Sequence, residues 1–279
     1  MHKDATPARA LTAATRSACS VSQWLPQSQE PIDDDVIEEV PIALVYNGIS
    51  HAVMLASPAD IEDFAIGFSL TEAIVQCADE VRDIEVESCG IGIEARMSIA
   101  PQRMAALKEQ RRALAGRTGC GLCGLESLQQ MVRPVPAVAA GGCLSAPVLD
   151  SAVAQLASRQ TLHLATGAAH AAAFVRWSGE VLVLREDVGR HNALDKLIGA
   201  MARAGVDSDA GFALVTSRAS YEMVHKTAMA GIRLLAAISA PTAMAARIAA
   251  QAGMTLVGFA GRTRRLVYAH SGRVQPAPR

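Results

Sequence analysis

Two cysteines in a glycine-rich loop are the residues whose types and spacing are best suited to chemistry. Cys120 and Cys123 form a CxxC pair within residues 116–124, where four of the nine residues are glycine. Glycine leaves the backbone free to curl and to expose both sulfurs. Backbone N–H groups at the start of a following helix and the neighbouring Arg117 would favour a thiolate. A thiolate can accept a mobile sulfur atom from a donor persulfide, and the second thiol is close enough to attack the loaded sulfur or to regenerate the first.

Other interpretations of this loop compete with a reactive thiol. The pattern Gly119-x-Gly121-x-x-Gly124 matches the dinucleotide-binding fingerprint, but that fingerprint follows a strand, whereas this segment follows a predicted helix and a polar loop. A thioredoxin-like redox pair would lie near the start of a βαβ unit, and a flexible loop without chemistry is the simplest alternative. A zinc site would need two more ligands, which only folding could bring from Cys143, His163, His170 or His191. The spacing favours a reactive sulfur site and leaves zinc open.

The segments before the loop predict a smaller α+β unit. Residues 1–35 are polar, contain an acidic run, and predict a flexible tail, with ordered structure beginning near Val36. Asn47-Gly48 between apolar runs predicts a hairpin of strands 42–46 and 49–55. Ser57-Pro58 then opens a helix with Ser57 as its N-cap. Further strand over 84–99 and a helix over 103–115 lead to the cysteine loop, so the unit spans residues 36–135.

The segments after the loop predict an α/β domain over residues 143–272. A helix from Ser145, a hairpin across Ser178-Gly179 and a helix after Asn192 come first. Strands 212–216, 232–238 and 254–259 then alternate with helices 220–230 and 241–251. This order implies parallel strands with right-handed crossovers and helices covering the sheet.

Composition restricts the classes of function. The formal net charge of −1 argues against broad binding to nucleic acid or to an anionic membrane. No apolar stretch is long enough for a membrane span, and the N-terminus lacks a signal-peptide pattern. Six cysteines in 279 residues are too few for a disulfide scaffold. We therefore expect a cytoplasmic protein in which a close cysteine pair is reactive or metal-binding.

Several long segments resemble the FdhD family, the sulfurtransferases that serve formate dehydrogenase. The cysteine loop does so from Arg117 to Leu128, and a second motif does so over Glu186–Lys196. The resemblance covers residues 36–270 in the order of the family, and its other segments are Val45–His51, Phe64–Glu72 and Ser217–Glu222.

The resemblance implies a substrate and partners that the residues alone do not name. Sulfur from a cysteine desulfurase would form a persulfide on Cys120 and pass to the Mo-bis-molybdopterin guanine dinucleotide cofactor, before that cofactor enters formate dehydrogenase. Cys123 matches the second cysteine of the family and is assigned as a helper or relay. The family further implies a homodimer and no metal of its own.

The fold implied by the resemblance is a cytidine-deaminase-like three-layer α/β core with a smaller N-terminal α+β subdomain. Zinc deaminases need the motifs H-x-E and P-C-x-x-C. Here no histidine is followed two residues later by glutamate, and Gly119 precedes Cys120. Deamination is therefore excluded as the activity.

A second segment matches the cofactor-binding segment of the family, just after the last strand of the βαβαβ series. It consists of Phe259, Ala260, Gly261, Arg262, Thr263 and Arg264. Ligands of open α/β sheets gather at the carboxyl ends of strands, and arginine offers a fork of donors to phosphate. A solvated basic turn is the alternative for this segment.

Asp187, Arg190 and His191 lie at a predicted strand-to-helix turn. Arg190 and His191 would contact phosphate near a helix N-terminus, or these residues would hold the turn by internal hydrogen bonds. His51 and His170 are more simply structural, and the remaining cysteines, Cys19, Cys77, Cys89 and Cys143, are expected to be unreactive. The competing functions are a non-catalytic chaperone of the molybdenum cofactor and a structural zinc protein.

Overall fold

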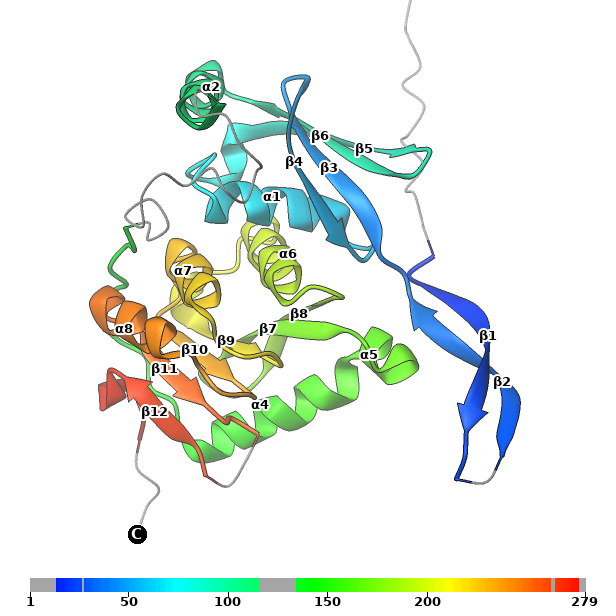
Figure 1. The fold of residues 1–279 in the computed structure, drawn as a ribbon. Coiled ribbons are helices and arrows are strands. Elements are labelled where there is room, and N and C mark those ends of the chain that lie inside the picture. Colours follow the sequence, from blue (N-terminus) through cyan, green and yellow to red (C-terminus); the bar gives the residue numbers. More distant parts are fainter. Residues whose placement is uncertain (1–13, 27, 116–133, 262–263, 276–279) are drawn as a thin grey trace, which may run out of the picture.

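The computed structural model describes residues 14–26, 28–115, 134–261 and 264–275. Within these ranges the chain forms a projecting hairpin, a small α+β unit and a larger α/β unit (Figure 1). Each of the two units has buried apolar side chains of its own, as the mixed α/β prediction requires.

The N-terminal segment forms a two-stranded antiparallel hairpin, which we call the arm. Strand β1 (Arg16–Trp24) pairs with β2 (Gln29–Ile37) over their whole lengths. The expectation of a flexible tail through residue 35 is therefore wrong for this segment, and residues 1–13 lie outside the described ranges. The acidic sequence of β2 does not predict a strand. The backbone hydrogen bonds between two antiparallel strands, however, do not require apolar side chains.

The small unit is a four-stranded sheet with helix α1 on one face. Its strands are β3 (Val40–Tyr46), β4 (Ile49–Ala56), β5 (Val81–Cys89) and β6 (Gly92–Ile99), in the order β4-β3-β6-β5. The predicted hairpin is confirmed, since β3 and β4 join at Asn47 and Gly48, both at positive φ. Alternate residues of β3 and β6 face the core, together with Phe64 and Phe68 of α1.

One helix of this unit begins later than the sequence predicted, and the other agrees with its prediction. Helix α2 (Pro101–Ala115) agrees with the predicted helix, and the short helix η1 (Ala78–Glu80) precedes β5. Helix α1 (Ile61–Thr71) begins after Asp60, so Ser57 is not its N-cap. Ser57 is instead fully buried and bonded to another part of the chain, as described below.

The large unit is a six-stranded sheet in the order β12-β11-β10-β9-β7-β8. Its strands are β7 (His170–Arg176), β8 (Val181–Asp187), β9 (Gly211–Val215), β10 (Leu234–Ala237), β11 (Thr255–Gly258) and β12 (Leu266–Ala269). Strands β9, β10 and β11 are parallel, which confirms the predicted βαβαβ order, and the outer strands are antiparallel.

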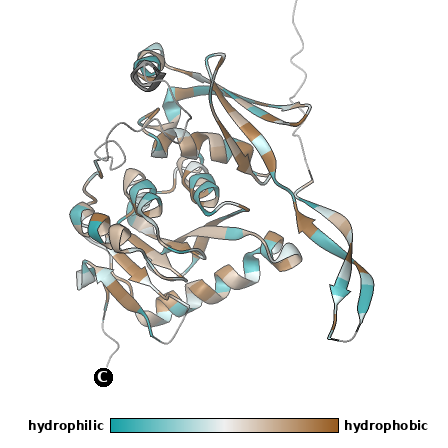
Figure 2. Ribbon diagram, viewed as in Figure 1, coloured by the Kyte–Doolittle hydropathy of each residue, from teal (hydrophilic) through white to brown (hydrophobic). Residues whose placement is uncertain are grey.

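Helices cover both faces of this sheet and make three layers (Figure 1). Helices α6 (Arg190–Arg203), α7 (Tyr221–Met229) and α8 (Ala243–Ala252) pack on one face. Helix α4 (Ala146–Arg159) packs on the other, followed by α5 (Thr161–Thr166), and two short helices, η2 (Ser208–Ala210) and η3 (Ser271–Arg273), complete the unit. Figure 2 shows the contrast between the hydrophobic central strands and the hydrophilic segments of the arm. No helix in the described ranges is long and apolar enough to cross a membrane.

The two units meet where α1 crosses α6. A Cβ atom on Gly67 would lie 1.7 Å from the carbonyl oxygen of Asp195, and one on Gly199 would lie 1.8 Å from that of Asp63. Any residue other than glycine at position 67 or 199 would keep the two helix backbones farther apart. Arg185 and Arg203 of the large unit also bind the carboxylate of Asp63, at 2.8 and 2.7 Å.

Candidate functional site

Four strands of the large unit end at the same edge of the sheet. Strands β8 and β9 each run antiparallel to β7, and β9, β10 and β11 are parallel, so all four point the same way. The loops that follow them lead into α6, α7 and α8 and into the segment after β11. This is the carboxyl edge, where open α/β sheets bind their ligands.

The segment predicted to bind the cofactor lies at this edge after β11. Phe259 has a φ of 56° and its N–H donates to the carbonyl of Ser239 at 3.2 Å, which fixes a sharp turn. The side chain of Ala260 is fully buried in the core, so only its backbone is available to a ligand. Gly261 and Arg264 are exposed, and Arg262 and Thr263 lie outside the described residues.

Asp187 lies at the end of β8 and is fully buried. Its carboxylate accepts hydrogen bonds from the N–H groups of Ser57 and Gly189, at 3.0 and 2.7 Å, and from the side-chain amide of Asn192 at 3.1 Å. The ammonium of Lys196 lies 2.6 Å from the same carboxylate. Of the two roles left open by the sequence, Asp187 therefore has the internal one.

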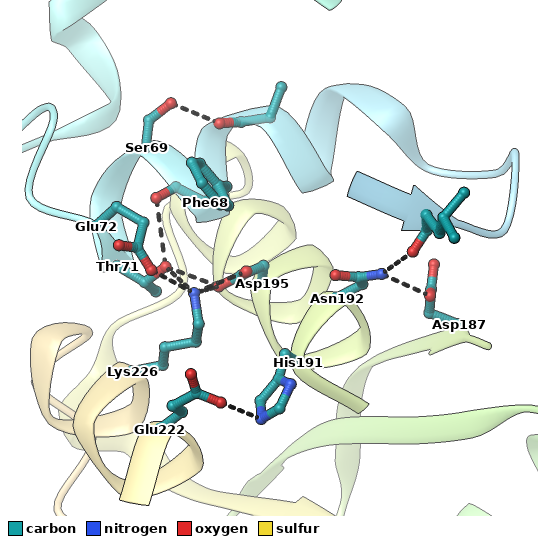
Figure 3. Close-up of polar contacts among 12 residues, drawn as sticks. Phe68, Ser69, Thr71, Glu72, Asp187, His191, Asn192, Asp195, Glu222 and Lys226 are labelled. Carbon is teal, nitrogen blue, oxygen red and sulfur yellow. Dashed lines mark hydrogen bonds and ion pairs between the residues drawn. The ribbon is translucent and has the colours of Figure 1, made fainter. Parts of the chain in front are cut away.

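Ser57 completes this buried cluster from the small unit. Its carbonyl accepts from Lys196 Nζ at 2.9 Å, and its hydroxyl accepts from the N–H of Val188 at 3.1 Å. Asn192 also donates to the carbonyl of Leu55 at 2.8 Å. These contacts hold the loop between β4 and α1 against the turn at the end of β8, and Figure 3 shows the bond from Asn192 to Asp187.

Arg190 and His191 form the first turn of α6, at the carboxyl edge. His191 Nε2 lies 2.8 Å from a carboxylate oxygen of Glu222, in the first turn of α7. This hydrogen bond lowers the pKa of Glu222 below its ordinary value. The Nε atom of Arg190 is buried, and no described residue accepts a hydrogen bond from it. The N-termini of α6 and α7 are thereby joined side by side.

His170, the first residue of β7, lies at the same end of the sheet as Arg190. Burial lowers the pKa of His170, and the nearby charge of Arg190 lowers it further. Arg218, in the loop after β9, is exposed at this edge. The exposed guanidinium of Arg218 favours an anionic ligand, although the chain as a whole is nearly neutral.

A second buried ionic cluster was missed by the sequence analysis. Lys226 of α7 is 6% exposed and lies within 3.1 Å of the carboxylates of Asp195 and Glu72 and of the hydroxyl of Thr71 (Figure 3). Burial alone would lower the pKa of Lys226, but the two carboxylates outweigh it and the pKa is raised. Lys226 is therefore a permanent cation that connects α7 to the end of α1.

The histidine at position 51 has aromatic neighbours. Its ring meets Tyr46 edge to face at 5.7 Å and Phe68 at 6.4 Å. The ammonium of Lys226 lies 5.4 Å above the ring of Phe68, and the hydroxyl of Tyr46 bonds to Ser69 at 2.8 Å. These contacts agree with the structural role expected for His51, and they extend the polar cluster at the junction of the two units.

Both cysteines of the CxxC pair, Cys120 and Cys123, lie outside the described residues. The other four cysteines are exposed and form no disulfide with one another. In the described ranges no three histidine, cysteine, aspartate or glutamate side chains gather to hold a metal.

Comparison with known proteins places the chain in a family. The model of the FdhD/NarQ family matches residues 37–275. The chain belongs to the FdhD/NarQ family. This confirms the resemblance seen in the sequence motifs.

Its relatives include the sulfur carrier protein FdhD of Cupriavidus necator, which is 55% identical over 261 residues, covering 94% of this chain and 91% of the relative. The protein of the same name from Bordetella bronchiseptica is 55% identical over 241 residues, covering 86% and 87%. The crystal structure of a putative formate dehydrogenase accessory protein from Desulfotalea psychrophila shares the fold. Its TM-score is 0.75 with 22% identity, and the match covers 94% of this chain and all of that one. The likeness to cytidine deaminases stays a prediction.

Proposed function

We propose that this chain is a sulfurtransferase that carries sulfur on Cys120 and delivers it to a molybdenum cofactor bound at the carboxyl edge. The donor would be a cysteine desulfurase, and the acceptor would be Mo-bis-molybdopterin guanine dinucleotide on its way to formate dehydrogenase. The relatives named sulfur carrier proteins and the accessory protein from Desulfotalea psychrophila support the sulfur chemistry and the recipient. We place the reaction in the cytoplasm, where thiols stay reduced.

The observation that carries the cofactor part of this proposal is the shared edge of the sheet. The segment after β11 and the turn at Arg190 are far apart in sequence, yet both follow strands that end on the same side. Four strand spacings separate β8 from β11, or about 20 Å. A ligand with two nucleotide ends needs an elongated site of this kind, and a compact mononucleotide does not.

The residues at the edge suit the anionic groups of such a substrate. Helices α6, α7 and α8 point their N-termini toward it, and the N–H groups of a first helical turn favour phosphate. Arg190, Arg218 and Arg264 add guanidinium donors along the edge. The ring of Phe259 supplies an aromatic surface for a purine.

The sulfur chemistry proceeds in balanced steps. The Cys120 thiolate attacks the outer sulfur of the donor persulfide, which forms a persulfide on Cys120 and releases the donor cysteine as a thiolate. If Cys123 acts as the helper, its thiolate attacks the inner sulfur and frees the outer sulfur as sulfide. That step leaves a Cys120–Cys123 disulfide, so the next round needs a dithiol reductant.

Mass spectrometry tests the first step. The purified chain is incubated with a cysteine desulfurase and cysteine, and the intact mass should rise by one sulfur atom, which dithiothreitol removes. Cys120→Ala should abolish the gain, while Cys77→Ala and Cys89→Ala, at exposed thiols elsewhere, should keep it. A Cys120→Ala protein that still gains the sulfur and still activates formate dehydrogenase would contradict the proposal.

Calorimetry with guanosine diphosphate tests the binding edge. Removing one guanidinium that contacts phosphate should weaken binding about tenfold. We expect this for Arg190→Ala and Arg264→Ala, and not for Arg247→Ala, an exposed arginine within α8. Equal affinity in all three variants would place the nucleotide elsewhere. Activation of formate dehydrogenase that survives loss of both Cys120 and Cys123 but fails in the arginine variants would indicate a cofactor chaperone.

A further inference from the structure

The turn that leads into α6 lies at the carboxyl edge and has donors without acceptors. It runs from Asp187, at the end of β8, to the first residues of the helix, and we call residues 187–191 the binding turn. Its N-cap is Gly189, so no side chain caps α6, and the N–H groups of the first helical turn have no partner within the helix. The buried Nε atom of Arg190 also has no acceptor among the described residues. In the proposed function these donors face a phosphate of the nucleotide.

Bonds within the large unit fix only part of the binding turn. Oδ1 of Asp187 accepts from the N–H of Gly189 at 2.7 Å and from Asn192 Nδ2 at 3.1 Å (Figure 3). A Cβ atom at position 189 would lie 2.8 Å from Asn192 Nδ2, so the backbone wraps closely around that side chain. These bonds leave the N–H of Val188 and the second carboxylate oxygen of Asp187 for partners from other segments of the chain.

Ser57 supplies partners for both groups from the small unit. Its N–H donates to Oδ2 of Asp187 at 3.0 Å, and its hydroxyl accepts from the N–H of Val188 at 3.1 Å. Its carbonyl accepts from Lys196 Nζ at 2.9 Å, and the same ammonium lies 2.6 Å from Oδ2 of Asp187. The N–H, the carbonyl and the hydroxyl of one residue therefore all bind the large unit. Because Ser57 is fully buried, water does not replace these bonds while the junction is closed.

The loop that carries Ser57 is strained and is held by the large unit. This loop joins β4 to α1, and its last residue, Asp60, has a φ of 52°, an uncommon conformation for a residue with a side chain. The carboxylate of Asp60 lies 3.5 Å from Nε of Arg185 in β8. The loop is therefore attached to β8 through Asp60 and to the binding turn through Ser57. A shift of the loop requires a shift of the turn.

We propose that Ser57 is a positioning residue for nucleotide binding, because its bonds to Asp187 and Val188 hold the binding turn in the form that presents Arg190 to the ligand. This inference rests on the proposed function, which places the nucleotide at this turn. It gives a residue of the small unit a role in a site built by the large unit. Without the bonds to Ser57 the turn has more conformations, and the apparent affinity falls with the fraction that is competent to bind.

Calorimetry with guanosine diphosphate compares two variants that each remove one buried hydroxyl of the small unit. Ser57→Ala removes the acceptor of the Val188 N–H, and the Kd for guanosine diphosphate should rise about fivefold. Thr71→Val is the matched control, because the Thr71 hydroxyl is also buried and also bonds to α6, at 2.7 Å from Asp195, farther along the helix from the carboxyl edge. Both variants should lose stability, but Thr71→Val should keep the Kd within about twofold.

Amide hydrogen exchange of the full chain gives a second, local measurement. The Val188 amide should exchange faster in Ser57→Ala than in the unmodified chain, and Thr71→Val should leave it slow. Binding and loop attachment are linked, so the effect must also run in reverse. Saturating guanosine diphosphate should therefore slow exchange at the amides of Ser57 and Val188 in the unmodified chain, and more than at the amide of Thr71.

Unchanged affinity in Ser57→Ala would refute the positioning role. Equal weakening by Thr71→Val would refute it as well, because stability alone would then explain the loss. If Ser57→Ala does not fold, the exchange measurement on the unmodified chain decides, and no slowing at Ser57 and Val188 overturns the inference. Failure of the proposed function is recognised separately: if Arg190→Ala and Arg264→Ala leave the affinity unchanged, the nucleotide binds elsewhere, and this inference falls with the proposed site.

Discussion

At the scale of single residues, two buried lysines connect the small unit to the large unit. Lys196 has a side-chain exposure of 0% and bridges Asp187 to the carbonyl of Ser57. Lys226 bridges Asp195 to Thr71 and Glu72. A buried ammonium is tolerated only when acceptors surround it, and in both clusters some acceptors come from the small unit and others from the large one. The same residues that satisfy these charges therefore also align α1 with α6 and α7.

Removing the Lys226 cation should be costly. Lys226→Met leaves Asp195 buried beside Glu72 without a counter-charge, and the free energy of unfolding should fall by about 3 to 5 kcal/mol. Urea denaturation followed by circular dichroism measures this. Lys108→Met, at an exposed position of α2, is the matched control and should change stability by less than about 0.5 kcal/mol.

The double variant with Asp195→Asn separates charge from packing. If the buried carboxylate is responsible for the loss, Lys226→Met with Asp195→Asn should be more stable than Lys226→Met alone. A double variant less stable than either single one would show instead that the loss comes from packing and hydrogen bonds.

The His191–Glu222 pair should make stability depend on pH in the acid range. The folded-state pKa of Glu222 is depressed by the hydrogen bond from His191. A depressed carboxyl pKa contributes stability above its unfolded value, and this contribution is lost as the pH falls through the folded value. Glu222→Gln should therefore reduce stability at neutral pH and match the unmodified chain once acid pH has protonated Glu222 in the folded state. Thermal melts across that range measure the difference, and a constant difference at every pH would contradict this assignment.

At the scale of secondary-structure elements, the packing of α1 against α6 determines how the small and large units join. Hydrophobic spacing predicted α1 and α6 individually, but it did not show that Gly67 and Gly199 let them cross backbone to backbone. Glycine in a helix costs roughly 1 kcal/mol relative to alanine. Its presence in both helices is explained by the close approach, because a Cβ atom would collide with a backbone carbonyl of the other helix.

Gly67→Ala should disrupt this crossing. The new methyl group would lie 1.7 Å from the carbonyl oxygen of Asp195, so the helices must separate. We expect a loss of about 3 kcal/mol, measured by chemical denaturation. Gly272→Ala is the control, because nothing lies within 4 Å of the added atom there. If alanine at position 67 is tolerated as well as at 272, the helices are not packed as described.

At the scale of the whole molecule, the arm is distinct from the body, by which we mean the small and large units together. The described arm contributes no side chain to the buried clusters of the body, whereas even the edge strand β12 buries Ala269. Folding of the small and large units therefore rests on residues from 40 onward.

Deleting residues 1–37 should leave the stability of the small and large units unchanged within about 0.5 kcal/mol, because no described residue of the arm lies in their buried clusters. Truncation after Arg264 is the comparison, because it removes β12 and the bonds that Arg273 makes to the carbonyls of Gly141 and Gly253. That truncation should destabilise the chain clearly in the same denaturation measurement. A large loss on removing the arm would show that it supports the fold of its own chain.

The sequence alone determined the features that depend on near neighbours. Asn47-Gly48 specified a hairpin, apolar runs and helical spacing specified the βαβαβ series, and the motifs around Cys120 and Glu186–Lys196 identified the family. The signals for these features lie within a few positions along the chain, so they can be read without the fold. The placement of Phe259–Arg264 after a strand followed from the same local pattern.

Only the tertiary structure decided the roles that depend on contacts between distant segments. Ser57 looked like a helix cap and is instead bonded to Asp187, 130 positions away, and Thr71 meets Asp195 across 124 positions. Lys226 has no local feature that marks it, because its partners come from α1 and α6. The sequence predicted a flexible tail where the structure has the arm, because backbone hydrogen bonds between two polar strands produce no pattern of apolar residues. In each case the deciding energy comes from burial or pairing with groups remote in sequence, and that term exists only once the chain has folded.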